Sequence, residues 1–281
     1  MNTYDAEYDR AKEVKQFDES KMGVKGLVDS GLTTIPRFFI HPPDTLSDLK
    51  PDSHTRPQSI SIPIIDLSDS HSAIVDQIGL AAREFGFFQI INHGIPLETL
   101  EGTLSAIKAF HEQPNEMKDP LYLREPVSNI RYFSNVDLYS AKAASWIDSL
   151  YVKVEANSTV LKELPEICRK EMTDWDKEVE LLADKLMGFL SEGLGLRRER
   201  LKEYTHLDES TMVGHYYPSC PQPDLTMGIA SHTDAGVLTV LLQDTTGGLQ
   251  VKYGELWVDI KPVHGALVIN VGDLLQVSSN S

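Results

Sequence analysis

The sequence predicts an α+β fold, with helices in its first two thirds and short strands in its last third. Apolar residues recur at helical spacing over 72–85, 96–110 and 165–194, which is typical of helices with one buried face. From Thr211 onward, short apolar runs alternate with turn residues, which indicates β-structure. Helices followed by strands favour an architecture in which a β-sandwich or jelly roll carries the functional site.

Composition and charge exclude several classes of protein. The 281 residues are 41% hydrophobic and 24% charged, which is enough for a sizeable core. The formal net charge of -16 makes a surface that repels phosphate backbones and anionic lipids. We therefore expect a small-molecule substrate as partner, and neither nucleic acid nor a membrane.

Cysteine usage and the N-terminus indicate the compartment. The sequence has two cysteines, Cys168 and Cys220, whereas a secreted chain of this size usually has more. The segment 1–16 is polar and has no apolar core of a signal peptide. We expect a cytoplasmic monomer that could also enter the nucleus by diffusion.

Changes in composition and hydrophobic pattern divide the chain into four segments. Residues 1–58 are predicted to form an N-terminal arm, because they end in a proline-rich stretch. Residues 59–165 are predicted to form an N-terminal domain with strands near 62–67 and 87–91. The connecting helix region covers 166–206, and an incomplete catalytic domain covers 207–281.

The sharpest local feature is the run Ser231-His232-Thr233-Asp234-Ala235-Gly236. His232 and Asp234 are two residues apart at a predicted strand end, so their side chains leave the same face. An imidazole and a carboxylate are two of the three ligands in the facial triad that binds non-haem iron(II). A bare His-x-Asp pair also occurs as a strand-end histidine beside a turn-capping aspartate. The pair alone therefore favours this structural interpretation.

The surrounding sequence reverses that preference. One characteristic stretch of sequence precedes the His-x-Asp pair, at 214–225. Four others follow it, at 237–244, 247–251, 257–260 and 265–273. This set resembles the catalytic half of the plant oxygenases that depend on non-haem iron(II) and 2-oxoglutarate. Runs at 64–67, 85–96 and 110–114 resemble the N-terminal domain of the same family. Within it, the runs at 23–30, 36–39 and 135–139 are most similar to homologues of 1-aminocyclopropane-1-carboxylate oxidase.

The resemblance implies a fold, cofactors and a reaction. The expected core is a double-stranded β-helix, or jelly roll, preceded by a helical and β N-terminal domain. His232 and Asp234 would bind Fe(II), and Tyr217 would contact the distal carboxylate of 2-oxoglutarate, with O2 as the second cosubstrate and ascorbate as an optional reductant. The reaction would hydroxylate or oxidise a small plant metabolite while the keto acid is decarboxylated to succinate. For Tyr217 alone, packing beside a proline turn is the structural alternative.

The resemblance also predicts what this chain lacks. The family's second metal-binding histidine, and the arginine and serine that hold the keto acid, would fall beyond Ser281. We therefore expect the last strands to be missing and the truncated chain to be impaired as an enzyme. His264, in a predicted hairpin turn, and His215, beside Tyr217, are not expected to replace the ligand. A non-catalytic binding protein and a cupin-like isomerase that reuses the barrel are the alternative functions.

The stretch after the second helix supplies the candidate substrate residues. In the family this region lines part of the substrate pocket, and here it contains Arg131, Tyr132 and Phe133, followed by Ser134 and Trp146. Aromatic residues beside one cation suit a planar or carboxylated small metabolite. Ordinary packing explains the same residues equally well.

Overall fold

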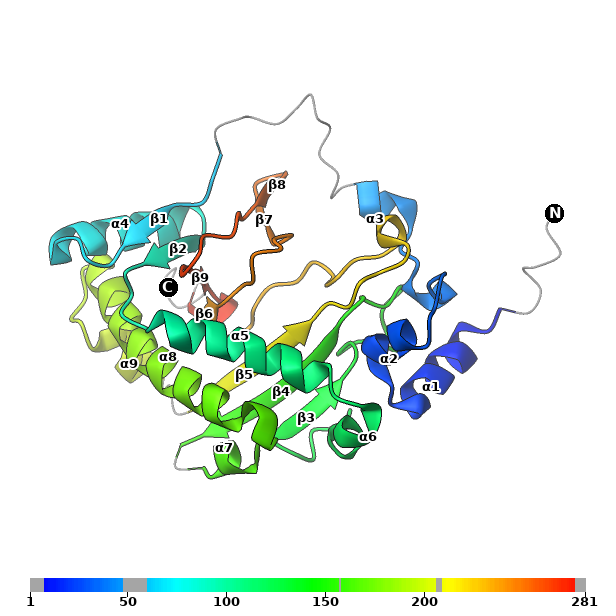
Figure 1. Cartoon of the computed structure of the whole chain (residues 1–281). Coiled ribbons are helices and arrows are strands. Elements are labelled where there is room, and N and C mark those ends of the chain that lie inside the picture. The colour runs from blue at the N-terminus through cyan, green and yellow to red at the C-terminus, as the bar shows by residue number, and fades with distance from the viewer. Residues whose placement is uncertain (1–7, 48–59, 157, 206–208, 276–281) are drawn as a thin grey trace. The chain divides into compact units, whose positions relative to one another are not determined.

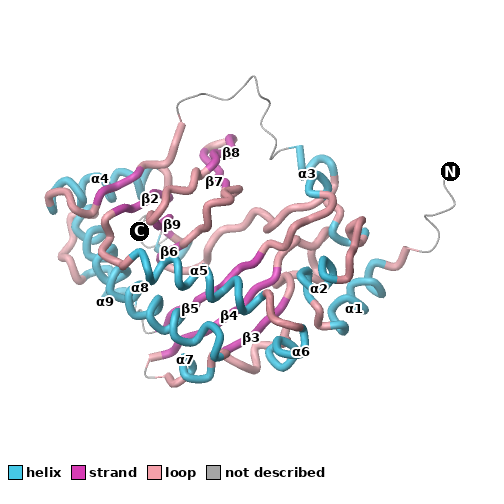
Figure 2. The backbone as a smooth tube through the Cα atoms, in the orientation of Figure 1, coloured by secondary structure: helices cyan, strands magenta, loops and turns pink. Residues whose placement is uncertain are grey.

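The computed structural model describes residues 8–47, 60–156, 158–205 and 209–275 (Figure 1). Their contacts divide the chain into two compact units, each assembled from separate stretches of sequence. The first unit comprises Met1–Lys50, Ile107–Cys168 and Glu209–Ser231, and the second comprises Pro51–Ala106, Arg169–Asp208 and His232–Ser281. Helices and strands occur in both (Figure 2), so the predicted α+β class is confirmed.

The first unit is built on an antiparallel sheet with the strand order β3-β4-β5. Its strands are β3 (Ile130–Phe133), β4 (Asp148–Glu155) and β5 (Glu209–Tyr216). The accompanying helices are α1 (Arg10–Ser20), α2 (Gly23–Asp29), η1 (Arg37–Phe39), α3 (Pro43–Ser47), α6 (Asn115–Lys118), η2 (Asp119–Leu121), α7 (Val160–Glu163) and η3 (Pro223–Leu225).

The two faces of this sheet differ. One face is buried, with Leu150 and Val152 fully inaccessible to solvent. Gly214 lies on the same face, and a Cβ there would come within 2.5 Å of the Ile107 side chain of α5 (Leu97–His111). Glycine at this position therefore allows the end of α5 to approach the strand. The other face carries the alternate residues, among them Val213, which is 42% exposed.

The N-terminal residues belong to the core of the first unit. Val14, Phe17, Val24, Phe38 and Phe39 pack in one buried cluster with Leu138, Ala144 and Trp146. The segment expected to be an arm therefore contributes several buried hydrophobic side chains to this core. Residues 1–7 and 48–58 of that predicted segment lie outside the described residues.

A buried carboxylate fixes the start of α2. Asp148 of β4 is inaccessible to solvent and accepts hydrogen bonds from the backbone N–H groups of Val24 and Lys25, each at 2.8 Å. The hydroxyl of Ser134 also donates to it. A carboxylate satisfies the unpaired N–H groups at a helix N-terminus and interacts favourably with its dipole. Asp148 therefore joins a strand to a helix that lies far away in sequence.

The second unit contains a four-stranded sheet with the order β1-β2-β9-β6. β1 (Ile64–Asp66) runs parallel to β2 (Phe87–Ile91), and β9 (Leu267–Val271) is antiparallel to β2 and β6 (Leu238–Leu241). A hairpin is formed by β7 (Gln250–Tyr253) and β8 (Leu256–Asp259). The helices are α4 (His71–Glu84), the first part of α5, α8 (Glu166–Gly193) from residue 169, and α9 (Arg200–Thr205).

The structure confirms the three predicted helices as α4, α5 and α8, and the predicted strand at 87–91 as β2. One turn was predicted wrongly. The residues 262–265 do not close a hairpin, because β8 pairs with β7 whereas β9 pairs with β2 and β6. The turn signal was correct, but the next strand enters a different sheet. None of the helices in the described ranges is long and apolar enough to cross a membrane.

Candidate functional site

The structure brings His232 and Asp234 together in the second unit. The Nε2 atom of His232 lies 3.5 Å from Oδ1 of Asp234, and the two side chains are 55% and 32% exposed. They lie on an irregular segment just before β6, whereas the sequence suggested a strand end. The pair is therefore close to solvent and accessible to a ligand.

Backbone hydrogen bonds to the end of β9 hold this irregular segment in place. The N–H of Asp273 donates to the carbonyl of Asp234 at 2.9 Å, and the N–H of Gly272 donates to that of Val237 at 3.0 Å. The hydroxyl of Thr233 donates to Oδ2 of Asp273 at 2.7 Å. These contacts replace the regular ladder that a strand would have formed.

The carboxylate of Asp234 is held from one side. Its Oδ2 atom accepts hydrogen bonds from the Thr239 hydroxyl at 2.6 Å and from the Asn270 amide at 3.0 Å. Thr239 of β6 and Asn270 of β9 lie directly opposite each other in the sheet. Two donors from neighbouring strands thus occupy one carboxylate oxygen and leave the other, Oδ1, beside His232.

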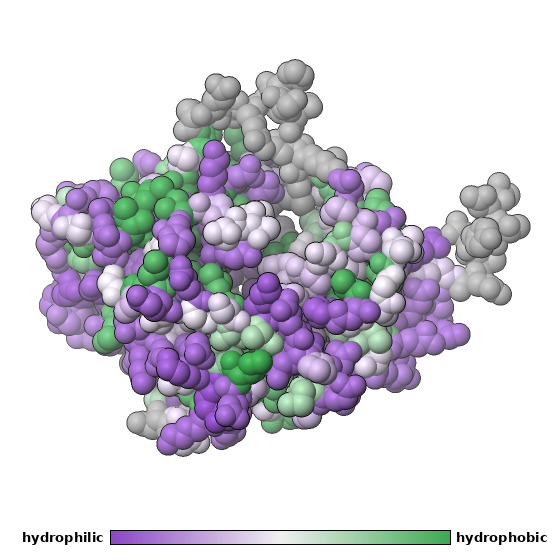
Figure 3. Space-filling view, in the orientation of Figure 1, coloured by the Kyte–Doolittle hydropathy of each residue, from purple (hydrophilic) through white to green (hydrophobic). Residues whose placement is uncertain are grey.

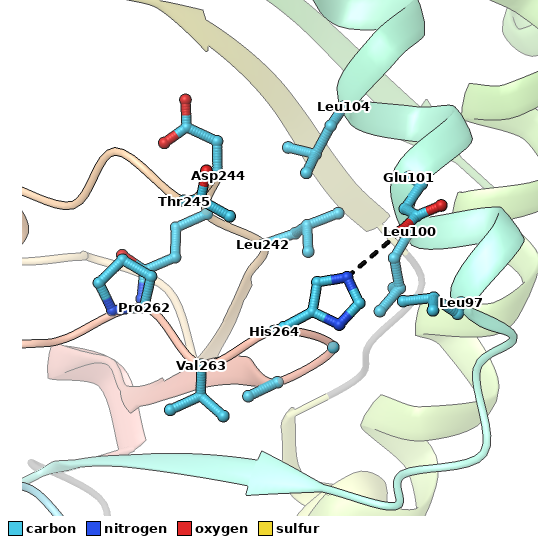
Figure 4. A pocket seen from close by; sticks show the side chains of 13 residues that line it. Leu97, Leu100, Glu101, Leu104, Leu242, Asp244, Thr245, Pro262, Val263 and His264 are labelled. Atoms are coloured by element: carbon cyan, nitrogen blue, oxygen red, sulfur yellow. Dashed lines mark hydrogen bonds and ion pairs between the residues drawn. The ribbon is translucent and has the colours of Figure 1, made fainter.

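No third ligand is found in the part of the chain that the structure describes. There, no group of three or more His, Cys, Asp or Glu residues could hold a metal ion. His264 lies instead on the rim of a cavity of about 220 Å³, where its Nε2 atom is 3.3 Å from the Glu101 carboxylate of α5 (Figure 4). Its side chain is 67% exposed, as expected for a histidine in a turn.

Tyr217 and His215 belong to the first unit. The Tyr217 side chain is 51% exposed, and partial desolvation raises the pKa of its hydroxyl to about 12. The phenol therefore stays protonated at neutral pH and can donate a hydrogen bond. His215 on β5 forms a hydrogen bond through Nδ1 with the Ser149 hydroxyl at 2.9 Å.

The three candidate substrate residues do not share one face of β3. Arg131 and Phe133 both line a cavity of about 360 Å³ in the first unit. Tyr132, between them, points to the opposite face, as the alternation of a strand requires. It is completely buried and its ring lies edge-on to Phe110 and Tyr122. Its surroundings are those of a packing residue.

Comparison with known proteins identifies the family. Residues 62–172 match the family described as non-haem dioxygenase in morphine synthesis, N-terminal, and residues 208–281 match the 2OG-Fe(II) oxygenase superfamily. The chain is 47% identical to 1-aminocyclopropane-1-carboxylate oxidase homolog 1 of Arabidopsis thaliana, over 98% of this chain and 76% of the relative. The chain belongs to the 2OG-Fe(II) oxygenase superfamily.

Other relatives agree with this family. A 1-aminocyclopropane-1-carboxylate oxidase homolog of Solanum lycopersicum is 44% identical, over 97% of this chain and 76% of the relative. Among solved structures, JOX2 in complex with 2OG, Fe and JA has a TM-score of 0.80 and 28% identity, over 92% of this chain and 75% of that one. The predicted oxygenase fold with a jelly-roll core is confirmed. So are the enzyme class and the use of iron(II), 2-oxoglutarate and dioxygen by this oxygenase family.

His232 and Asp234 have the chemistry of two iron(II) ligands of this superfamily. Imidazole nitrogen and carboxylate oxygen are two of the facial-triad donors. Neighbouring ligands of an octahedral ion with bonds near 2.1 Å are about 3 Å apart. The distance from Nε2 of His232 to Oδ1 of Asp234 is 3.5 Å. A small adjustment of the side chains would bring the two atoms to the ligand spacing. The oxygen nearest the histidine is also the one that Thr239 and Asn270 leave unoccupied.

Replacing Gly272 with alanine is expected to loosen this part of the oxygenase. A Cβ at residue 272 would contact the carbonyl oxygen of Gly236 and lie 2.6 Å from its carbon. Backbone atoms cannot swing aside as a side-chain tip can, so we expect Gly272→Ala to lower the free energy of unfolding by about 1–3 kcal/mol. Urea unfolding measures this change.

The matched control is the glycine on the other side of this close approach, just before β6. A Cβ at Gly236 meets no atom within 4 Å, so Gly236→Ala should leave the free energy of unfolding nearly unchanged. Equal unfolding midpoints for Gly272→Ala and the unaltered chain would show that the close approach is not a constraint.

Proposed function

We propose that this chain is an oxygenase that hydroxylates or oxidises a small plant metabolite. His232 and Asp234 are two of the ligands of its iron(II), and Tyr217 contacts the 2-oxoglutarate. Bound iron(II) supplies activation of dioxygen, with the keto acid as the source of the remaining electrons. The substrate contacts proposed in the first unit are Arg131 and Phe133.

Each of these side chains has a defined task in the proposal. His232 donates a neutral imidazole nitrogen to the metal. Asp234 donates Oδ1, while Thr239 and Asn270 neutralise part of the charge on its Oδ2 atom. The protonated phenol of Tyr217 donates a hydrogen bond to a carboxylate.

A single observation carries the metal assignment. The Nε2 and Oδ1 atoms approach to 3.5 Å on a segment without regular secondary structure, and hydrogen bonds fix the orientation of the carboxylate. Imidazole nitrogen and carboxylate oxygen are donors that iron(II) takes in such sites, and this pair presents one of each.

Metal titration of the His232→Ala and Asp234→Ala variants tests this function. Cobalt(II), added without oxygen, serves as the probe, and its visible absorption reports binding. We expect one cobalt ion per chain in the unaltered protein and an affinity at least about tenfold lower in either variant. Any release of succinate from 2-oxoglutarate should be lost in both variants.

The control replaces a histidine outside the pair. His264→Ala removes an exposed imidazole that pairs with Glu101, and it should bind cobalt(II) as the unaltered chain does. If His232→Ala and Asp234→Ala also keep the affinity of the unaltered chain, the metal lies elsewhere and the assignment is wrong.

A further inference from the structure

The cavity of about 360 Å³ in the first unit lies against β3 and β4 and has the chemistry of an acid-binding site. Its volume is within the range of about 300–1,000 Å³ that is usual for small-molecule sites. The charged and aromatic residues that matter here are Arg124, Glu125, Arg131, Phe133, Asp137 and Tyr151. The charged groups differ sharply in how far they are already paired.

Arg124 is fully engaged in holding the protein together. Its Nε atom donates to the Asp18 carboxylate of α1 at 2.6 Å. The Nη1 and Nη2 atoms donate to the backbone carbonyls of Asn135 at 2.8 Å and Ser134 at 2.6 Å. A ligand would have to displace these bonds, so Arg124 is a structural residue of the cavity wall.

The guanidinium of Arg131, unlike that of Arg124, is mostly without hydrogen-bond partners among the described residues. Its side chain makes one hydrogen bond, from Nη1 to the carbonyl of Arg124 at 3.2 Å, and no ion pair with any described residue. Its Nε atom is closed to water and has no hydrogen-bond partner. A charged donor that is buried without a partner is costly and rare in native proteins. The Nη2 atom is not among the buried atoms and has no hydrogen-bond partner in the described residues, so it is the donor open to a ligand.

Aromatic rings support the same guanidinium. Its central carbon lies 4.3 Å from the centre of the Tyr151 ring and 5.6 Å from that of Phe133. Tyr151 is directly opposite Arg131 in the antiparallel pair of β3 and β4. These contacts fix the plane of the charge at the wall of the cavity and place apolar surface next to it.

We propose that this cavity binds an organic acid with a single carboxylate and a planar or apolar body. The Nη2 atom of Arg131 donates a charge-assisted hydrogen bond to the carboxylate, and the body of the acid lies against Tyr151 and Phe133. Glu125 and Asp137 are exposed members of the lining and would repel a second negative charge. Monoanions are therefore preferred over dianions.

The proposal names a substrate class, and in that respect it rests on the proposed oxygenase function. Binding of the acid itself needs no metal and no turnover. It is measured by calorimetry on the 281-residue chain without metal, with benzoate, cinnamate and octanoate as probes. Cinnamamide is the neutral counterpart of cinnamate, and succinate is the dianion.

We expect at least one monocarboxylate to bind, and cinnamamide and succinate to bind at least about tenfold more weakly. Arg131→Gln should weaken the binding of the best monocarboxylate by about 10–100-fold, because the positive charge and its charge-assisted hydrogen bond are lost. Arg131→Lys keeps the charge without the planar guanidinium that stacks on Tyr151, and its affinity should fall between those of Arg131→Gln and the unaltered chain. Arg83→Gln, an exposed arginine of α4, is the control and should bind as the unaltered chain does.

The proposal would be overturned if no monocarboxylate binds, or if cinnamate and cinnamamide bind equally. It would also be overturned if the Arg131→Gln variant has the melting temperature of the unaltered chain and still binds the acid with unchanged affinity. None of these results bears on cobalt binding at His232 and Asp234. Loss of the acid site and failure of the metal assignment are therefore separate outcomes.

Discussion

Replacing Asp148 with alanine is expected to lower the free energy of unfolding of the first unit by about 3–5 kcal/mol, the cost typical of breaking a buried charged network. The backbone N–H groups of Val24 and Lys25 and the hydroxyl of Ser134 would lose their common acceptor. Lys118 is only 1% exposed, and it would lose the negative charge of Asp148 that lies near its ammonium group.

The charge balance explains why the effect is large. Desolvation lowers the pKa of Lys118, while Asp148 raises it. Desolvation likewise raises the pKa of Asp148, and hydrogen bonds from Ser134, Lys25 and Val24 lower it. Each buried group therefore depends on the others to remain in the protein interior.

Equilibrium unfolding in urea measures the change, with Trp146 as the reporter in the first unit. The other two tryptophans, Trp175 and Trp257, lie in the second unit and are replaced by phenylalanine in all variants. Glu19→Ala is the control, because Glu19 forms an exposed ion pair with Lys15 in α1 of the same unit and such pairs contribute about 0.3–0.5 kcal/mol. If Asp148→Ala and the control variant lower the free energy of unfolding equally, the hydrogen bonds to Asp148 do not stabilise the first unit.

The helices of the second unit could be predicted because their periodicity is local. Residues such as Ile74, Ile78 and Ala81 repeat at helical spacing, and all three are buried in the structure. The proximity of His232 and Asp234 was likewise expected from their spacing of two, although the structure places them on an irregular segment that contacts with the end of β9 hold in place. Both conclusions depend on residues that are close in sequence.

The strands β3 and β4 were not predicted, although β4 carries a signal. Leu150 and Val152 alternate with Ser149 and Tyr151, and the apolar pair is the buried one. The region was interpreted only as a stretch of candidate substrate residues. Recognising 130–133 as a strand would have placed Arg131 and Tyr132 on opposite faces, because successive side chains of a strand alternate.

Contacts between distant residues could not be predicted. Asp148 meets Val24 across 124 positions, and Asn270 meets Asp234 across 36. Such contacts depend on strand register and helix placement, which one sequence does not specify. The division into four linear segments stays a prediction, while the contacts of the structure join separated stretches into two units.

Replacing Asn270 with leucine is expected to weaken cobalt(II) binding by about 10–100-fold, which is the usual cost of losing a residue that orients a metal ligand. Asn270 donates to Oδ2 of Asp234 at 3.0 Å, and Thr239 donates to the same atom at 2.6 Å. Without these donors the carboxylate can rotate, and its free Oδ1 atom no longer stays beside His232. Thr239→Val should have an effect of similar size.

The double variant separates orientation from general loss of stability. If both residues act through one carboxylate oxygen, Asn270→Leu combined with Thr239→Val should weaken binding by less than the product of the single effects, because each removes part of the same constraint. Thr246→Val is the control. Thr246 also donates to an aspartate, Asp244, but in an exposed turn, so this change should leave cobalt affinity unaltered. Wild-type affinity in both single variants would mean that Asp234 is oriented by its backbone alone.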